Sequence, residues 1–487
     1  MKRFSPTDLM RFFISPYESW ATRYSSEIDS TIFIKDPENE FLSMAKRKGD
    51  DHEYKILRRY QDEKLSIKMI PDSGPREERL DATKQALLDG LDIIYQGSLE
   101  NEFFFGKTDF LVKTHGDSNL GNYRYEILDA KLARRAKAEH IIQLSCYREL
   151  LENIQGKVSD NASLIYGDGE LERFNLDNYD SFYKALREKF FNFHASFNPD
   201  NIPDPALYDE WGIYSEYAKN IIQQTNNLSS IAGIRKSQIK KLKEANINSC
   251  EELINSEISK ETKINPKVLD RLKLQAKHQL KSKKNSKLSF EVLPHSERGL
   301  GLKGLPEKSL NDVYFDLESN TFTVPMTLHY LWGFAYEKNF HKKFDCFWAH
   351  TQEDMKEVFE SFVDMLMDKF SEDPKMHVFH YGAFEVTTLK TLAGYFSSKS
   401  DEIDHLLRNN VFIDLFKLVK QSFCIGSTGY GLKDIEPIFR NERTEEVTGG
   451  TESMIQYELW SANNDETKDE TDSELLRSIW EYNREDC

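Results

Sequence analysis

The chain has few cysteines and no long hydrophobic run. Its 487 residues include five cysteines, which lie far apart without the short spacings of a zinc site or a disulfide-rich scaffold. No apolar stretch approaches the roughly 20 residues that span a bilayer. Pro6, Asp8 and Arg11 interrupt any signal-peptide-like segment at the start. These absences predict a protein of the reducing cytoplasm with no membrane association.

The chain also has fewer basic than acidic residues, 65 Lys and Arg against 82 Asp and Glu. The formal net charge is −17 at pH 7, which argues against a protein that coats nucleic acid non-specifically. It does not exclude a nuclease, because the metals that active-site carboxylates bind neutralise their charge. The length suggests about three domains. We place them at residues 1–204, 205–290 and 291–487, and expect a multi-domain α/β protein.

Two short apolar runs in the first domain each end in charged residues that a buried strand does not need. One run precedes Asp109 and the other contains Asp129 and Lys131. Because the last two are two residues apart, both project from one face of a strand. Asp109 and Asp129 together can hold a hard divalent cation, and Lys131 can steady charge on a phosphate or its attacking water. The alternative is a surface salt pair of little energetic value.

The helix expected after this strand adds Gln143 and Tyr147 on one face. With Gly49-Asp50-Asp51-His52 upstream, the order of motifs resembles the PD-(D/E)xK nucleases of the RecB type, including the CRISPR-associated RecB-like exonucleases. The resemblance implies a restriction-endonuclease-like core, with Asp109, Asp129 and His52 as metal ligands. A capping or solvent-exposed role is the alternative for His52.

Relatives in that family often carry an iron–sulfur cluster whose first cysteine lies in a Cys-Pro-x-x-x-Trp segment. Here the segment is Ser15-Pro16-Tyr17-Glu18-Ser19-Trp20, and residues 203–219 contain no cysteine. Because cluster ligation needs thiolates, we expect no iron–sulfur cluster. Aromatic residues in both segments are expected to form a core instead.

The middle of the chain is locally basic. Residues 235–287 contain fifteen Lys and Arg against six Asp and Glu. Gly233, followed by a helical pattern that contains Lys236, Lys240 and Lys241, resembles a helix–hairpin–helix, in which a glycine turn and lysines contact a DNA phosphate. A solvated basic helical linker is the alternative.

A second group of acids lies in the third domain. Asp316 and Glu318 end an apolar strand and share its face, Glu385 opens a later helix, and Tyr482 and Asp486 lie one helical turn apart near the end. Four carboxylates on three separated elements suit two metals about 4 Å apart. This half resembles the DnaQ-like 3′–5′ exonucleases of the RNase H fold, in which Tyr482 would orient the water. Most of that family has Asp where Glu385 stands and Asn where His380 stands.

Two other stretches receive simpler interpretations. Gly426–Lys433 lacks the contiguous Gly-Lys-Ser/Thr of a P-loop, and no strand is evident before it, so we expect an ordinary loop after a helix at 414–423. Asp414 is expected to cap that helix. Residues 441–474, rich in acidic and small polar side chains, are expected to form a mobile acidic insertion.

The leading hypothesis is a DNA nuclease that uses Mg²⁺ or Mn²⁺ at both sites and acts on single strands or ends, in DNA repair or anti-phage defence. Proteins that resemble both halves in this order commonly continue into a superfamily 1 helicase. We therefore expect a helicase domain in a longer chain or as a partner. Two alternatives remain open: a non-catalytic nucleic-acid-binding module with degenerate nuclease folds, and an RNase, since nothing reports on the 2′-hydroxyl.

Overall fold

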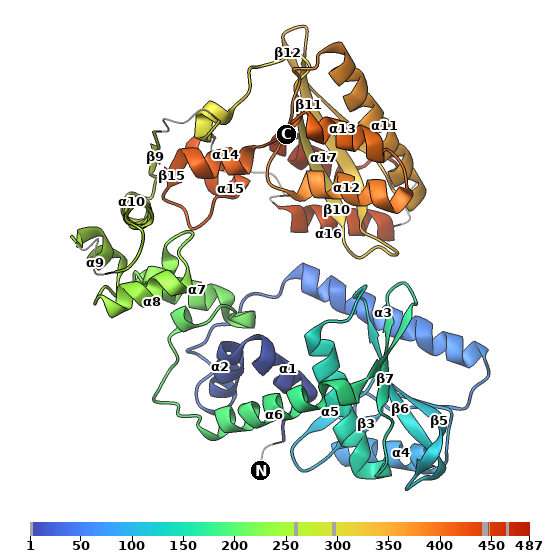
Figure 1. Ribbon diagram of the computed structural model, residues 1–487. Coiled ribbons are helices and arrows are strands. Elements are labelled where there is room, and N and C mark those ends of the chain that lie inside the picture. Colours follow the sequence, from blue (N-terminus) through green and yellow to red (C-terminus); the bar gives the residue numbers. More distant parts are fainter. Residues whose placement is uncertain (1–2, 258–261, 295–298, 441–446, 448, 464–466) are drawn as a thin grey trace. The chain divides into compact units, whose positions relative to one another are not determined.

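The protein consists of two compact units, residues Met1–Ile221 and Ile222–Cys487. The computed structural model describes residues 3–257, 262–294, 299–440, 447, 449–463 and 467–487 (Figure 1). The boundary between the units falls inside the segment 205–290 that we expected to be a separate domain, so the division into three domains stays a prediction. No helix of the described residues is long and apolar enough to cross a membrane.

The first unit is built on a mixed sheet of six strands in the order β1-β2-β5-β6-β7-β8. Neighbours are antiparallel except β1 with β2 and β6 with β7. Two further strands form a small hairpin, β3 (Ser98–Glu100) with β4 (Phe105–Lys107). The strands of the large sheet are β1 (Ile67–Met69), β2 (Ile93–Tyr95), β5 (Phe110–Ser118), β6 (Gly121–Lys131), β7 (Asn161–Tyr166) and β8 (Leu171–Asn175).

Local capping signals define several helices of this unit. Ser5 forms a capping box with Asp8 at the start of the first helix, and Ser15 caps the second through the amide of Glu18. Ser15 also donates to the carbonyl of Glu210, at 2.7 Å. The helices are α1 (Pro6–Ile14), α2 (Pro16–Glu27), α3 (Glu40–Asp62), α4 (Arg76–Leu88), α5 (Ala138–Gln155) and α6 (Asp180–Ala195), followed by α7 (Ser215–Gln224) at the unit boundary.

The alternation of side chains along β6 divides the core of the first unit. Tyr125 and Ile127 pack on one side with residues of α5, whereas Leu128 and Ala130 pack on the other with residues of α3. A separate aromatic cluster joins α2 to the segment around Tyr214. Its buried members are Tyr17, Trp20, Tyr24, Phe33 and Tyr214.

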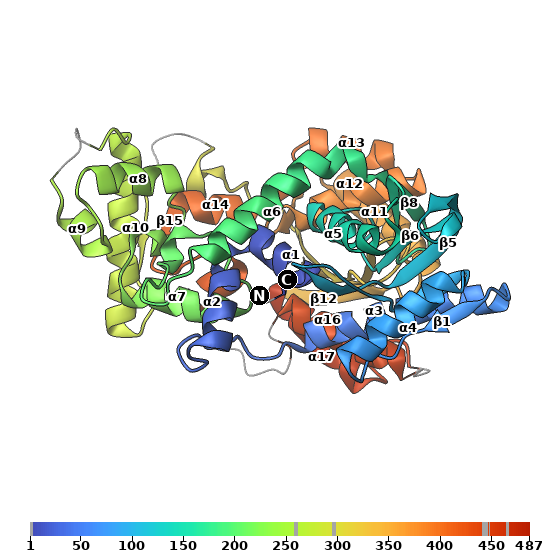
Figure 2. The ribbon, with the colours of Figure 1, turned by 90° about the horizontal axis from the view of Figure 1, so that it is seen from below.

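The second unit begins with a group of helices around a small core of its own (Figure 2). α8 (Lys236–Glu244), α9 (Cys250–Asn255) and α10 (Pro266–Asn285) bury leucine and isoleucine side chains against one another. A short strand, β9 (Phe290–Val292), follows and pairs with β15 (Phe423–Ile425). β15 directly precedes Gly426, so the expectation that no strand precedes this loop was wrong. Its three residues give no pattern in the sequence, and its partner is far away along the chain.

The larger part of the second unit is a five-stranded sheet in the order β12-β11-β10-β13-β14. β11 is antiparallel to both β10 and β12, whereas β10, β13 and β14 run parallel. The strands are β10 (Val313–Asn320), β11 (Leu328–Lys338), β12 (His341–Trp348), β13 (Val378–His380) and β14 (Phe412–Asp414).

The α-helices after β12 in the described part of the chain are α11 (Gln352–Glu372), α12 (Phe384–Phe396), α13 (Ser400–Arg408), α14 (Leu415–Ser422), α15 (Leu432–Ile435), α16 (Gly450–Ala462) and α17 (Glu474–Asp486). Asp414 caps α14 through the amide of Lys417, as expected. The described part of the expected acidic insertion contains α16, whose Tyr457 and Trp460 belong to the core. The interpretation as a mobile insertion was therefore wrong for these residues, because buried aromatic side chains hold the helix in place; residues 441–446, 448 and 464–466 lie outside the described part.

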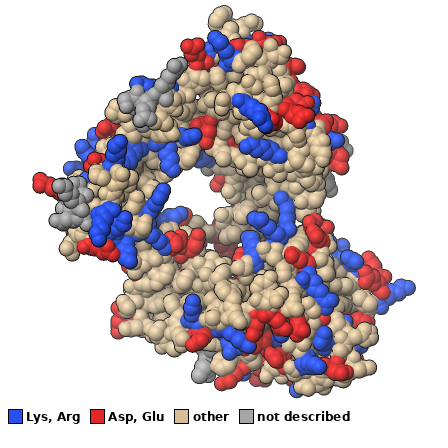
Figure 3. All heavy atoms as spheres, viewed as in Figure 1, with Lys and Arg blue, Asp and Glu red and all other residues tan. Residues whose placement is uncertain are grey.

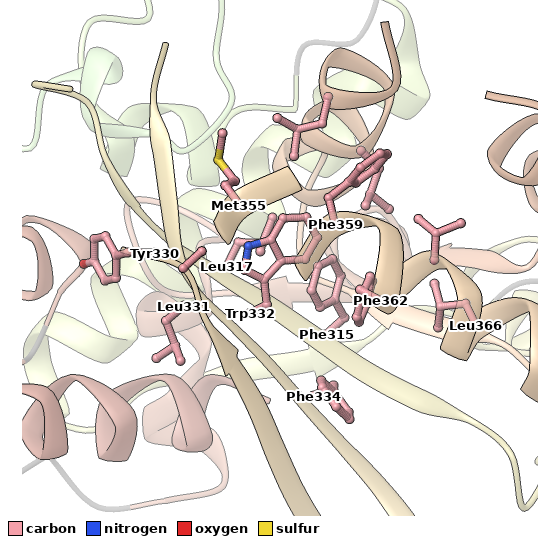
Figure 4. Packing of buried hydrophobic residues seen from close by; sticks show 14 of the residues in the cluster. Phe315, Leu317, Tyr330, Leu331, Trp332, Phe334, Met355, Phe359, Phe362 and Leu366 are labelled. Atoms are coloured by element: carbon pink, nitrogen blue, oxygen red, sulfur yellow. The ribbon is translucent and has the colours of Figure 1, made fainter. Parts of the chain in front are cut away.

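The core of this sheet is formed by the odd-numbered side chains of β10 together with α11 and β11 (Figure 4). Phe315 stacks on Phe362 with ring centroids 4.3 Å apart, and Trp332 lies beside both. Because successive side chains of a strand point to opposite faces, this packing turns Asp316 and Glu318 to the other face.

Substitution of Phe362 by Ala is expected to destabilise the second unit by about 3–5 kcal/mol, since it leaves a cavity beneath the sheet. The matched control is Phe340→Ala, which removes the same atoms from a hairpin residue that is 86% exposed and is expected to change stability by about 0.5 kcal/mol or less. Urea unfolding followed by circular dichroism measures both. Equal effects of the two substitutions would contradict the described core.

Candidate functional site

In the first unit, Asp129 and Lys131 lie on the face of β6 that carries Tyr125 and Ile127, which is the face covered by α5. Asp109 directly precedes β5, and its Oδ2 accepts a hydrogen bond from the amide of Ala130 at 2.8 Å. The β5–β6 register pairs Phe110 with Leu128, which brings Asp109 next to Asp129. The structure therefore places these three predicted residues together.

The charges in this group are strongly coupled. Lys131 Nζ lies 2.5 Å from Asp129 Oδ2, whereas Oδ1 of this buried aspartate has no hydrogen-bond partner among the described residues. Removal from water raises the pKa of Asp109 well above its usual value, and the charges of Asp129 and Glu53 raise it further. Burial lowers the pKa of Lys131, but Asp129 and Asp109 more than offset this, so its pKa is raised. The lysine is thus held as a cation beside the carboxylates.

Gln143 and Tyr147 of α5 lie beside this group. The Gln143 side-chain amide donates to the Tyr147 hydroxyl at 3.3 Å, and that hydroxyl donates to the carbonyl of Lys107 at 2.6 Å. Burial raises the pKa of Tyr147, with further contributions from Asp129 and Asp109. These contacts tie α5 to the strand ends that carry the acids.

The residue of α3 that faces the acids is Glu53, which the sequence did not identify. Glu53 accepts hydrogen bonds from Gln96 (2.6 Å) and Tyr95 (3.3 Å), and burial and the charge of Asp129 raise its pKa. The predicted ligand His52 is buried, and its Nε2 lies 3.2 Å from the carbonyl of Ile165. The sequence offered only one indication that Glu53 belongs to this site, which is that it directly follows His52 of the predicted Gly-x-x-His motif.

In the second unit, Asp316 and Glu318 share the face of β10 that is opposite to the aromatic core. Burial raises the pKa of Asp316 well above its usual value, and Glu318, Asp486 and Glu385 add to the shift. Burial likewise raises the pKa of Glu318 to about 8, although hydrogen bonds with Ser453 and Asn483 oppose the shift. The structure thus gathers the four predicted carboxylates into one electrostatic group.

Glu385 lies in the first turn of α12 and is 4% exposed. Its Oε2 is buried without a hydrogen-bond partner among the described residues and lies 3.5 Å from Nδ1 of His380. The same His380 nitrogen is 2.6 Å from the carbonyl of Gly382. Glu385 and His380, which stand where most DnaQ-like exonucleases have Asp and Asn, are therefore neighbours in the structure.

α17 supplies the remaining residues of this group. Burial raises the pKa of Tyr482, and the charges of Asp486, Glu318 and Asp316 raise it further. Asn483 donates to Asp316 Oδ2 at 2.7 Å, which fixes that carboxylate. Space for Asn483 exists because Gly333, the β11 residue opposite Asp316, has no side chain.

Three contributors to this second site were missed by the sequence: Asn483, Ser453 and Lys433. Lys433 Nζ lies 4.8 Å from the ring centroid of Tyr482, and its charge lowers the pKa of Glu318. Asn483 is adjacent to the predicted Tyr482, but nothing in the sequence predicts which helical neighbour faces the strand. Lys433 lies in the stretch that we had set aside because it is not a P-loop.

Of the predicted phosphate-binding residues of the helical segment, Gly233 lies just before α8 and the three lysines lie on it. Gly233 has a left-handed backbone (φ +78°), and a Cβ there would meet no atom within 4 Å. Lys236 and Lys240 are exposed one turn apart. Lys241 donates to the carbonyl of Lys263 at 3.0 Å, so its ammonium group is engaged within the protein.

Oxygen-rich groups of this kind suit Mg²⁺ or Mn²⁺. Within the described residues, no three His, Cys, Asp or Glu side chains stand in an arrangement that could already hold a metal ion. The donor chemistry nevertheless fits such an ion, since buried carboxylate oxygens of Asp129 and Glu385 have no hydrogen-bond partner in the described part of the chain. In addition, neighbouring acids raise the pKa of Asp109 and of Asp316.

Gly333→Ala is expected to disrupt the second site, because the new Cβ would lie 1.6 Å from Asn483 Oδ1. Displacing Asn483 should destabilise the unit by about 1–3 kcal/mol. The matched control is Gly394→Ala in α12, where nothing lies within 4 Å of the added Cβ and where Ala should stabilise by about 0.5–1 kcal/mol. Thermal unfolding compares the two; destabilisation by both variants alike would contradict the close approach.

Without divalent metal, the stability of the second unit is expected to fall as pH rises from about 5 to about 9. The pKa of Glu318 is raised to about 8, so the folded state keeps a proton that the unfolded state releases near pH 4.5, and that contribution is lost as pH rises through 8. Glu318→Gln should flatten this decline, whereas Glu357→Gln, at an exposed site on α11, should not. Urea unfolding in chelator at several pH values measures the slope, and a slope unaffected by Glu318→Gln would contradict the buried charge.

A comparison with protein-family models matches residues 313–487 to the RNase_H superfamily. A search of the curated proteins finds no significant match. The matched range contains the five-stranded sheet and all four carboxylates of the second group. Residues 313–487 therefore form an RNase H-like domain, which is a nuclease-type fold.

Proposed function

We propose that this protein is a metal-dependent nuclease that hydrolyses phosphodiester bonds in DNA. The observation that carries the proposal is the group formed by the buried Glu318 and Glu385 and the partly buried Asp316 and Asp486 on the RNase H-like domain. Like charges withdrawn from water repel one another, and divalent cations relieve that repulsion. We infer DNA rather than RNA as the substrate from the resemblances to RecB-type and DnaQ-like nucleases. We infer a superfamily 1 helicase, as a partner or as a further domain, from the order of these two halves along the chain.

At the second site, the four carboxylates would hold Mg²⁺ or Mn²⁺. A bound metal activates the attacking water and stabilises charge on the phosphate. Asn483 fixes the position of Asp316 through its 2.7 Å hydrogen bond. Tyr482, next to Asp486 and Glu318, is placed to orient the water, and its raised pKa keeps its hydroxyl protonated as a donor. This arrangement supports 3′–5′ exonuclease chemistry.

At the first site, Asp109 and Asp129 would hold the metal, with Glu53 in place of or in addition to His52. Lys131 remains protonated beside them and can stabilise the charge that grows on a phosphate. Gln143 and Tyr147 brace α5 against the strand end. The mixed sheet with its parallel β6–α5–β7 connection and this set of residues support the PD-(D/E)xK resemblance.

A binding module with degenerate sites is the second candidate. It is favoured by one observation: the carboxylates of the described residues do not stand in a metal-coordinating arrangement. In such a module the Lys131–Asp129 pair would be a structural ion pair. The same experiment separates the two functions.

The experiment incubates the protein with end-labelled single- and double-stranded DNA and RNA, in Mn²⁺, in Mg²⁺ or in chelator. Wild type should cut DNA only with metal. Lys131→Ala and Asp316→Ala should each remove one cleavage activity by about 10²-fold or more, and the double variant should remove both. The matched controls Lys157→Ala and Asp401→Ala alter exposed residues of the same two units and should cut normally.

Absence of cutting by wild type with either metal would support the binding module instead. Cutting that survives Asp316→Ala but not Lys131→Ala would leave the RNase H-like domain without a catalytic role. Preferred cutting of RNA would overturn the assignment of substrate. Binding of Mn²⁺, measured by calorimetry, gives a second readout that does not depend on turnover.

A further inference from the structure

The second unit contains a hollow of about 500 Å³ that neither candidate site uses. Its walls are the turn at Gly233, one side of α10, the residues Phe416 and Lys420 of α14, and the loop Thr428–Tyr430. Three cations line it, Lys267, Arg271 and Lys420, and no acidic residue does. Figure 3 shows Lys and Arg gathered over the region of α8, α10 and α14. In a chain of net charge −17, such a lining favours an anionic ligand.

Two cations of the hollow, Lys267 and Lys420, are exposed and available to a ligand. Arg271 Nη2 donates to the hydroxyl of Tyr430 at 3.1 Å and to the carbonyl of Phe423, which holds the guanidinium in place. Its Nη1 is buried and has no hydrogen-bond partner among the described residues. Arg271 therefore adds a fixed positive charge to the wall of the hollow, which attracts an anion.

The loop that closes the hollow is held rigidly. Asp434 accepts hydrogen bonds from the hydroxyl of Ser427 and the amide of Gly431, both at 2.8 Å. The hydroxyl of Tyr381 donates to the carbonyl of Tyr430 at 2.6 Å. Gly429 is required here, because a Cβ would lie 2.3 Å from Asp434 Oδ2. The loop is therefore pre-organised, which reduces the entropy lost on binding.

Aromatic side chains alternate with the cations. Phe416 and Tyr430 line the hollow, and Lys420 Nζ lies 5.5 Å from the centroid of the Phe416 ring. Aromatic surfaces between cations stack on unpaired bases while the cations contact the backbone. A duplex hides its bases and offers only phosphates to such a surface, so the lining fits a single strand better than a duplex or a simple anion.

The chain that leaves this loop connects the hollow to the RNase H-like site. Tyr430, the last residue of the loop, lines the hollow, and Lys433, three residues later in α15, lies over the ring of Tyr482. Phe416 of the hollow packs on Tyr381 with ring centroids 5.8 Å apart, and Tyr381 follows His380, the neighbour of Glu385. A strand bound in the hollow would thus lie beside the elements that carry the carboxylates.

We propose that this hollow binds a single-stranded nucleic acid through its phosphates and bases and holds it for the RNase H-like site. The delivery of the strand to the RNase H-like site rests on the proposed nuclease function, which this inference deepens. It also shifts phosphate binding from Lys240 and Lys241 of α8 to Lys267 and Lys420, with Gly233 retained as part of the wall.

The test measures binding of a fluorescein-labelled oligothymidylate to the full chain in chelator, by anisotropy at several salt concentrations. Lys267→Ala/Lys420→Ala should weaken binding at least about 5-fold at physiological salt. It should also lower the slope of log affinity against log salt by about 1.4, since each single-strand phosphate contact contributes about 0.7. The control removes the same charge elsewhere in the unit: Lys375→Ala/Lys390→Ala alters two exposed lysines and is expected to leave the slope unchanged.

A second measurement places the strand directly. Val268 lines the hollow and is 38% exposed, so Val268→benzoylphenylalanine should crosslink to the oligonucleotide under light. Tyr395→benzoylphenylalanine, on α12 and 51% exposed, should not. Crosslinking at both positions or at neither would overturn the proposal, as would a slope unchanged in Lys267→Ala/Lys420→Ala. Equal competition by polyglutamate would assign the hollow to an acidic protein segment instead.

The experiments distinguish a failure of the proposed strand-binding site from a failure of the proposed nuclease function. If wild type never cuts DNA but the two lysines and the crosslink behave as expected, the strand site stands and the nuclease proposal falls. If wild type cuts with metal but the lysine pair changes neither the salt slope nor the KM for oligonucleotides, the nuclease proposal stands and the strand site falls.

Discussion

The repulsion among buried carboxylates is the constraint on which both candidate sites depend. In the first unit, burial and neighbouring acids raise the pKa of Asp109 and of Glu53. In the second, burial raises the pKa of Asp316 and Glu318, and the charges of nearby acids add to it. Folding alone gains nothing from such groups, because each carboxylate loses hydration and gains a like charge as neighbour. A bound cation, as proposed for both sites, would convert the repulsion into attraction.

Strand alternation determines on which face of each strand the acids lie. In β10, Phe315 and Leu317 pack in the apolar core, so Asp316 and Glu318 take the opposite face. In β6, both faces pack against apolar side chains, and Asp129 follows Tyr125 and Ile127 on the face that α5 covers. Helices contribute polar side chains near the acids in both units: Asn483 of α17 donates to Asp316, and Tyr147 of α5 donates to the carbonyl of Lys107, two residues before Asp109.

The helical segment and the loop around Gly429 add a different kind of surface. Their cations line the hollow, whereas the acids lie at the sheets, so the contacts proposed for a phosphate backbone are separate from the groups that would hold metal. Such a separation would allow an acidic protein to bind nucleic acid, because the two kinds of charge lie on distinct elements and screening by salt keeps their effects local.

The sequence by itself determined which residues have the chemistry and on which face of a strand they lie, because side-chain alternation and helical spacing are local properties. Asp129 with Lys131, Asp316 with Glu318, and Tyr482 with Asp486 follow from spacing alone. Only the tertiary structure decided that Glu53 faces the first acids while His52 contacts a backbone carbonyl, and that Asn483, Ser453 and Lys433 surround the second group. It also decided that α16 is packed and that β15 exists. The reason is that these features arise from contacts between segments far apart in the chain, and no local pattern encodes which distant partner a side chain meets.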